Sequence, residues 1–320
     1  MALTALLDVE LTVPRPDQLA AFWERRGLVP TAPGVLGTAD RASQLRLREG
    51  PYRHVSELRL ACDDEADLAR AARRLEALGA TVRLGAGELR VADPILDHDV
   101  VLTVGAAAPL TPPAPRELNR PGQLARVDRR SSACLGRTPR APRRVGHVVF
   151  GTPDVEASRA FYVDGLGFEV SDGIAGGLGW FLRCSTDHHN LLLMPAPVPC
   201  LNHYAVELDD LDAIGLTAMD VLGERAAELA DAPVSVAGPG RHVLGANLFW
   251  YLLDPAGGMF ELFADMDQIV DSAAWARDSF DDGWDPFGIA AWSPADPLPD
   301  FFLPADIADL AAAREAAGVR

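Results

Sequence analysis

The chain has 320 residues, of which 48% are hydrophobic and 23% charged, which is enough for about two globular domains. Its formal net charge of −17 argues against a nucleic-acid-binding surface, which depends on a basic face. No apolar run approaches the roughly 18 residues of a membrane helix, so we expect a protein that binds neither nucleic acid nor membrane.

The first predicted element is a strand at residues 6–14, where apolar and polar residues alternate. A helical stretch follows it and ends in the aromatic pair Phe22-Trp23, before a turn that contains glycine and leucine. Further strand-like segments continue to about residue 105. We therefore expect a first module over residues 1–105.

The next segment, from Pro109 to Arg144, differs in composition from the rest of the chain. It holds nine arginines against Glu117 and Asp128, and it is rich in proline. Proline-rich charged segments are extended and solvated, so residues 106–144 are expected to be an interdomain linker. A basic arm that binds a partner is the alternative.

A second module, expected over residues 145–267, repeats the first. Residues 146–153 resemble the first strand, and the helix that follows ends in the pair Phe161-Tyr162. Aligning the aromatic pairs, the Asp-Asp pairs and the Asp-Pro pairs matches His147 with Asp8, His203 with Glu57 and Glu261 with Val100. Each copy is a strand, a helix and several strands, which indicates an internal duplication.

The tail, expected over residues 268–320, spaces three tryptophans among acids and prolines. These are Trp275, Trp284 and Trp292, and a short helix is predicted after them at residues 305–317. We expect the tail to pack against the second module, where it could also cover a sheet edge or a subunit contact.

Three residues distinguish the second module from the first: His147, His203 and Glu261. Each lies in an otherwise apolar strand, where His147 and Val149 share one face. One such residue alone would suggest a hydrogen-bonded strand residue. Two imidazoles and a carboxylate buried together are costly unless a divalent metal binds them. Two histidines and one carboxylate are also the ligand set of non-haem Fe(II) oxygenases.

Further polar residues lie in the same module. His188 and His189 are adjacent, so in an extended chain at most one of them faces the metal. His242 stands in a glycine-flanked loop, where a surface histidine is equally compatible with the pattern. Tyr251 lies in an apolar strand, where an aromatic residue is ordinarily part of the core.

The second module resembles the type I extradiol ring-cleavage dioxygenases of the vicinal oxygen chelate superfamily. The resemblance rests on the segments GHVVFGTPDVEASRAFY, FLRCSTDHHNLLL, LNHYAVELDDLD and GRHVLGANLFWYLLDPAGGMFEL. It implies an α+β fold of two tandem modules, each of paired βαβββ units that form curved, barrel-like mixed sheets around a central cavity. It also implies a homo-oligomer that uses O₂ to cleave a catechol ring next to its two hydroxyl groups.

By this resemblance the metal ligands are His147, His203 and Glu261. They imply Fe(II) as the cofactor, although the same ligands also serve Mn(II). His189 is implied to be the acid-base residue beside the O₂ site. The first module keeps none of the ligands, so one metal ion is expected per chain.

The resemblance also implies residues around the substrate. His242 and Tyr251 match the family's hydrogen-bonding residues next to the bound catecholate, and Val149 and Phe181 fall where the family lines its ring pocket. After His242 the family often has polar residues, whereas this chain continues with Val243 and Leu244.

Two other functions within the same superfamily are alternatives. A glyoxalase-type isomerase or a thiol transferase would draw metal ligands from two paired modules, and the first module offers only Asp8, Glu57 and Val100. A metal-free ligand-binding protein would not require two inward histidines and a glutamate. Metal content separates these alternatives.

The cysteines and the N-terminal residues predict the compartment. The four cysteines are widely spaced and form no CxxC pair, which fits a reduced protein. Asp8 and Glu10 lie within the apolar start, which also lacks the basic residues of a secretory signal. We therefore expect a cytoplasmic protein.

Overall fold

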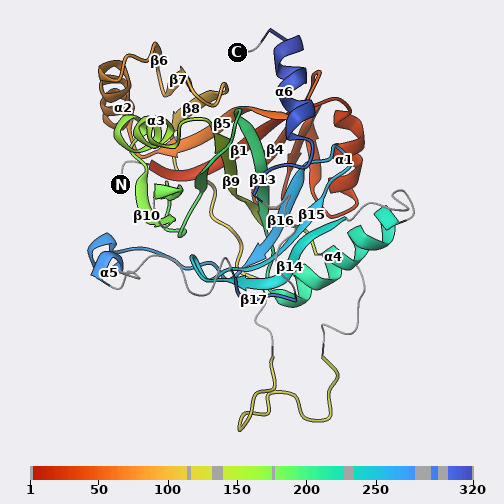
Figure 1. Ribbon diagram of the computed structural model, residues 1–320. Coiled ribbons are helices and arrows are strands. Elements are labelled where there is room, and N and C mark those ends of the chain that lie inside the picture. Colours follow the sequence, from red (N-terminus) through yellow and green to blue (C-terminus); the bar gives the residue numbers. More distant parts are fainter. Residues whose placement is uncertain are drawn as a thin grey trace.

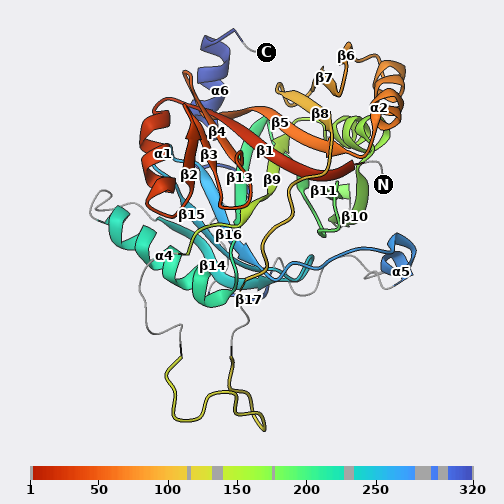
Figure 2. The same ribbon diagram turned by 180° about the vertical axis from the view of Figure 1, so that it is seen from behind.

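The computed structural model describes residues 3–113, 117–131, 140–174, 177–226, 234–277, 290–294 and 302–318. Its strands form two mixed sheets, one in each half of the chain (Figures 1 and 2). The first sheet has the order β2-β3-β4-β1-β5-β8-β7-β6, and the second has the order β10-β11-β12-β9-β13-β16-β15-β14-β17. Each order runs from one edge strand to another, so neither sheet closes into a barrel.

The first half contains two βαβββ units in succession, as predicted. Their elements are β1 (Leu3–Val13), α1 (Pro16–Glu24), β2 (Val29–Ala32), β3 (Val35–Gly37), β4 (Leu45–Glu49), β5 (His54–Cys62), α2 (Glu65–Ala77), β6 (Val82–Gly85), β7 (Glu88–Ala92) and β8 (Asp99–Val104). Strands β1 and β5 pair antiparallel at the centre, and each is parallel to the last strand of its own unit.

The second half repeats this order. Its elements are β9 (Arg144–Thr152), α3 (Val155–Ala160), the π-helix η2 (Phe161–Leu166), β10 (Glu169–Ile174), β11 (Gly179–Arg183), β12 (Leu191–Pro195), β13 (Cys200–Glu207), α4 (Leu211–Ala226), β14 (Ser235–His242), β15 (Leu248–Leu253) and β16 (Met259–Ala264). Strands β9 and β13 form the antiparallel centre. Asp154 caps the N-terminus of helix α3, because its carboxylate accepts a hydrogen bond from the backbone N–H of Ala157 at 2.9 Å.

The two halves share one continuous apolar core, which also packs their helices against the sheets. Trp23 of α1 donates from Nε1 to the Tyr204 hydroxyl of β13 at 2.9 Å. At a second contact between the halves, Arg74 of α2 donates to the carbonyl oxygen of Gly165 in η2 at 2.9 Å. Each half therefore covers part of the other.

The strand registers confirm two of the three correspondences between the modules. His147 stands opposite Ala205, and Asp8 stands opposite Arg59 in the matching strand pair of the first sheet. Ala205 and Arg59 are separated by the same number of residues as His203 and Glu57. The strand pairings therefore agree with matching His147 to Asp8 and His203 to Glu57.

The third correspondence is wrong by one residue. Glu261 pairs with Ala205, and the residue that pairs with Arg59 is Val101 rather than Val100. The segment between the Asp-Pro turn and the strand is one residue longer in the first module, so aligning the turns displaces the strands. Alternate residues face opposite sides of a sheet, so an error of one residue places a side chain on the wrong face. Val100 belongs to the face that packs in the apolar core, whereas the residue that matches Glu261 lies on the opposite, inner face.

The segments outside the sheets follow different paths. The described linker residues 117–131 project away from both sheets (Figures 1 and 2). In the tail, α5 (Ser272–Arg277) lies beside β10, and β17 (Ala290–Trp292) pairs with the edge strand β14. Helix α6 (Ile307–Ala316) is held to the first half as well, through the ion pair of Asp306 with Arg53 at 2.8 Å.

The tail therefore covers a sheet edge, as anticipated for an aromatic segment of this kind. Trp275 donates from Nε1 to the carbonyl oxygen of Ser171 in β10 at 3.0 Å. Trp284 lies outside the described residues. None of the helices in the described segments combines the length and apolarity needed to cross a membrane.

Candidate metal centre

The three predicted ligands come from the adjacent strands β9, β13 and β16 and meet on one face of the second sheet. One ligand atom from each of His147, His203 and Glu261 lies within 4.8 Å of the others, and all three residues are buried. His147 Nε2 is 2.7 Å and His203 Nε2 is 3.4 Å from Glu261 Oε2. Within the described ranges, no other group of three His, Cys, Asp or Glu residues meets this limit.

A small residue between the ligands lets them converge. In the row across the strands, Ala205 stands directly between His147 and Glu261. Strands lie about 4.8 Å apart, so side chains from the two outer strands must lean over the middle one to meet. The methyl group of Ala205 leaves room for this, whereas Arg59 occupies the same place in the first module.

Neighbouring amides orient the ligands. His203 Nδ1 lies 2.7 Å from Asn202 Oδ1, so Nδ1 carries the proton and Nε2 presents a lone pair. His203 Nε2 is buried and lacks a partner in hydrogen-bond geometry, and Asn247 Nδ2 donates to Glu261 Oε1 at 2.8 Å. A buried nitrogen without a partner is costly, and a divalent cation beside Glu261 would satisfy it. The donor set therefore fits a metal ion.

The electrostatics of the site favour the metal-binding protonation states. Burial lowers the pKa of His203 to about 4, so its ring is neutral at pH 7. Burial alone would raise the pKa of Glu261, but the charges and hydrogen bonds of His147, His203 and His242 together outweigh burial and the pKa falls well below its usual range. A neutral imidazole and an ionised carboxylate are the forms that bind metals.

A cavity reaches the ligand His203 and has both apolar and polar lining residues. It is lined by Val149, Ile174, Phe181, His189, Leu192, Met194, Asn202, His203, His242, Leu244, Tyr251 and Phe302. The predicted substrate and acid-base residues all lie among them. Apolar walls with a few convergent polar groups suit a flat aromatic ligand that carries hydroxyl groups on one edge.

Three polar residues on the cavity wall surround the metal ligands. His242 Nε2 is 2.8 Å from the Tyr251 hydroxyl, and the His242 ring stacks on Phe249 with 4.1 Å between centroids. Burial and then the Glu261 carboxylate raise the pKa of Tyr251 well above its usual value, so the phenol stays protonated. Burial lowers the pKa of His189 well below its usual value, which leaves that ring neutral at pH 7.

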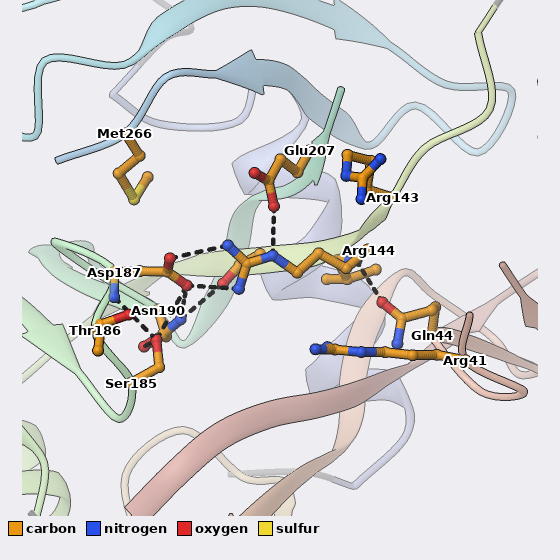
Figure 3. A network of polar contacts seen from close by, with 12 residues as sticks. Arg41, Gln44, Arg143, Arg144, Ser185, Thr186, Asp187, Asn190, Glu207 and Met266 are labelled. Atoms are coloured by element: carbon orange, nitrogen blue, oxygen red, sulfur yellow. Dashed lines mark hydrogen bonds and ion pairs between the residues drawn. The ribbon is translucent and has the colours of Figure 1, made fainter. Parts of the chain in front are cut away.

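The loop that carries His189 is held by a buried ion-pair network (Figure 3). Arg144 donates to both carboxylate oxygens of Asp187, at 2.7 and 2.9 Å, and a third bond goes to Glu207. Asn190 donates to Asp187 and to the carbonyl oxygen of Gly146 at 3.1 Å each. Arg144, counted above with the linker, is therefore the first residue of β9 and an anchor of the site.

Replacing Arg144 with methionine is expected to destabilise the protein by about 3 to 5 kcal/mol, because it leaves Asp187 buried without its cation. Urea unfolding monitored by circular dichroism measures the change. The matched control is Arg129→Met, which breaks an ion pair with Glu117 whose side chains are 59% and 53% exposed. The control should change stability by about 1 kcal/mol or less. Equal losses in the two variants would contradict this role for Arg144.

The stability gained from Asp187 should also depend on pH. Burial raises the pKa of this carboxyl, but Arg144 outweighs burial and brings the pKa from 3.8 to about 2, which corresponds to about 2 kcal/mol. Because the folded-state pKa is lowered, this stabilisation is complete above about pH 4 and is lost as the pH falls toward 2. The difference between wild type and Arg144→Met should therefore shrink over that interval.

Several site residues carried no signal in the pattern of the sequence. Asn202 and Asn247 hold the ligands by their side-chain amides, and Asp187 holds the His189 loop. An amide directly before a histidine, or at the start of an apolar strand, is a signal only once the ligands are known. Phe302 reaches the cavity from the tail, far along the chain from the last strand of the module.

The inner face of the first sheet holds a charge network in place of a metal-binding set. Arg46 bonds Asp8 at 2.9 Å and Glu10 at 3.0 Å and also contacts Glu57. Arg90 bonds the other oxygen of Glu57 at 2.5 Å. Guanidinium groups thus neutralise the carboxylates that this face carries.

Residues 144–262 match the family model of the Glyoxalase/Bleomycin resistance protein/Dioxygenase superfamily. Metapyrocatechase 2 of Cupriavidus necator is 30% identical over 256 residues, which cover 76% of this chain and 74% of that protein. An iron-dependent extradiol dioxygenase of Rhodococcus jostii is 32% identical over 42% of this chain and 47% of its own length. A manganese-dependent 2,3-dihydroxybiphenyl 1,2-dioxygenase of Geobacillus genomosp. 3 is 32% identical over 39% and 40%.

Solved structures share the fold at lower identity. The Mn(II)-bound glyoxalase of Novosphingobium aromaticivorans has a TM-score of 0.65 and 23% identity, and covers 94% of each chain. The 2,2',3-trihydroxybiphenyl 1,2-dioxygenase of Sphingomonas wittichii has a TM-score of 0.63 and 17% identity, over 85% of this chain and 94% of that one. At these identities the match establishes the architecture alone.

Proposed function

This chain belongs to the extradiol dioxygenases of the Glyoxalase/Bleomycin resistance protein/Dioxygenase superfamily, and we propose that it cleaves a catechol ring next to the two hydroxyl groups with Fe(II) and O₂. The observation that carries the proposal is the convergence of His147, His203 and Glu261 next to a cavity with mainly apolar walls, which His203 itself helps to line. Three protein ligands on one side leave the opposite side of a metal open to substrate.

The residues of the chain have distinct roles in this reaction. When bound, Fe(II) supplies open coordination positions for both catechol oxygens and for O₂, and a path for electrons from the ring to O₂. Val149 and Phe181 hold the ring by apolar contact, and His242 and Tyr251 donate hydrogen bonds to the catecholate oxygens.

His189 is assigned the proton transfers. Its ring is neutral at pH 7, so it can accept a proton from a catechol hydroxyl and hold it for return to an oxygen atom that comes from O₂. His189 lines the cavity but is not one of the three metal ligands, so its ring can take part in proton transfer without leaving the metal.

The proposal is tested by loading purified protein with Fe(II) under anaerobic conditions and then adding O₂ and a panel of monocyclic and bicyclic catechols. A yellow ring-fission product is expected, with one iron atom per chain. Loading with Mn(II) in parallel tests the second metal that the ligands accommodate, since both iron- and manganese-dependent relatives exist. Absence of turnover with every catechol and both metals would overturn the proposal.

A metal-dependent isomerase of the same superfamily is the second activity to be tested, because the architecture that this chain shares with the glyoxalase structure does not distinguish the two activities. An isomerase would be active with Mn(II), zinc or nickel and would not consume O₂. The same preparations loaded with these metals, and an oxygen electrode, separate the two activities.

Phe302 forms part of the cavity wall from the tail, and its side chain is half-exposed. Replacing Phe302 with alanine should widen the cavity and raise the kcat/KM ratio of a bicyclic over a monocyclic catechol by about tenfold, the scale of one side-chain contact. Trp292→Ala, which alters an exposed tail aromatic on β17, is the control and should leave the ratio unchanged. An unchanged ratio in Phe302→Ala would mean that this wall does not select substrates.

A further inference from the structure

A chain of hydrogen bonds runs from the protein surface to His189. Asp172 of β10 places Oδ2 2.7 Å from His188 Nε2, and His188 Nδ1 lies 3.0 Å from His189 Nδ1. The Asp172 side chain is 14% exposed, while both histidines are buried. The chain therefore connects solvent to a residue of the cavity wall.

The direction of these bonds follows from the chemistry of the three groups. A carboxylate only accepts hydrogen bonds, so His188 donates from Nε2 to Asp172. In the neutral His188 ring the other nitrogen, Nδ1, then carries a lone pair and accepts from His189 Nδ1. His189 in its neutral form is left with a lone pair on Nε2, the nitrogen that remains for the cavity.

Packing holds His188 in this orientation. Its ring lies between Phe181 at 5.4 Å and Trp275 at 5.5 Å, measured between ring centroids. Gly245 comes close on another side, where an added Cβ would lie 2.9 Å from His188 Nδ1, in the space that the His189 bond requires. The Gly245 φ angle of +79° also favours glycine at this position.

We propose that Asp172 and His188 are positioning residues that fix the tautomer of His189 so that Nε2 faces the substrate as a proton acceptor. This inference rests on the proposed function, because it supplies the base that the reaction needs. The arrangement follows the logic by which a buried aspartate orients the histidine of a hydrolase triad, here with a second histidine in between. The proton taken up by His189 Nε2 comes from a catechol hydroxyl and returns to oxygen, so the step needs no further reactant.

The proposal predicts a spectroscopic result in protein without metal. Of the seven histidines, His189 can be assigned in ¹⁵N-histidine-labelled protein by its loss from the His189→Ala spectrum. In the wild type its Nδ1 is expected to carry the proton and its Nε2 to be bare. In Asp172→Leu and His188→Leu the His189 nitrogens should show a mixture of both tautomers.

Kinetics of the Fe(II)-loaded variants form the second arm. Asp172→Leu and His188→Leu should lose at least about tenfold in kcat, with KM for the catechol and iron content unchanged. His188→Gln is the conservative variant, because its amide can donate to Asp172 and accept from His189, and it should recover both the tautomer and most of kcat. Asp17→Leu, at an exposed position on α1, is the control.

The outcomes separate this inference from the proposed function. A wild-type tautomer in both leucine variants, loss of iron from them, or failure of His188→Gln to recover kcat would overturn the positioning role. If the wild type turned over no catechol but the tautomer responded as expected, the proposed function would fail while the hydrogen-bond chain itself stood.

Discussion

Replacing Glu261 with alanine is expected to leave a folded protein that no longer retains iron. The carboxylate is the sole anionic member of the ligand set, and its Oε2 is 2.7 Å from His147 Nε2 and 3.4 Å from His203 Nε2 in a buried site. Two neutral imidazoles alone would have to bind a divalent cation in an apolar surrounding with no charge to balance it. Iron content after anaerobic loading and desalting, measured by plasma mass spectrometry, should fall from about one atom per chain to background.

The matched control for this prediction is Glu156→Ala. Glu156 lies on α3 in the same module, its side chain is 61% exposed, and its contacts are to Arg159 and Trp180 at the surface. That variant should load iron as the wild type does. Full iron content in Glu261→Ala would refute the assignment of all three ligands, since their convergence depends on the carboxylate.

Replacing His189 with alanine is expected to lower kcat by about 10²- to 10⁴-fold while iron content and catechol affinity stay near wild-type values. The ring of His189 lies 4.3 Å from that of His147 between centroids, yet it is outside the set of ligand atoms that meet at the metal position. Its removal therefore takes away a proton acceptor without taking away a ligand. Iron content, stopped-flow binding of the catechol without O₂, and steady-state turnover measure the three quantities.

His54→Ala is a suitable control for this variant, because His54 is partly buried on the first sheet, where its ring contacts that of Tyr52 at 4.5 Å between centroids. It should leave kcat unchanged. If His189→Ala instead lost its iron, His189 would be a ligand and the acid-base role would have to move to another residue that lines the cavity, such as His242.

The ligands could be predicted from the sequence because a duplicated module provides an internal comparison. Polar residues in apolar strands stood out at His147, His203 and Glu261 against a first copy with different residues at these places. The same comparison failed by one residue at Val100, since turn motifs align loops and the loops differ in length. Strand register is set by pairing between strands, which a single sequence does not reveal.

The supporting residues could not be predicted, because their contacts join segments that are distant in sequence. Asp172 meets His188 across a turn, and Phe302 reaches the cavity through a tail that has no repeat with which to compare it. Of the adjacent pair His188-His189, only His189 lines the cavity. That the other ring serves as its hydrogen-bond partner depends on bends in the loop, which alternation along a strand does not describe.

The shared core has a consequence for how the two halves of the chain can diverge. Trp23 of helix α1 in the first half is fully buried and bonded to Tyr204 of the second, so packing between the two halves constrains this position. The inner face of the first sheet is constrained differently. There, Arg46 and its carboxylate partners need only balance one another. We therefore expect residues at the contact between the halves to change slowly during evolution. Residues on the inner face of the first sheet should instead change in compensated pairs of opposite charge. The first half supplies no metal ligand, yet deleting it should destabilise the second half, because the two halves share one apolar core.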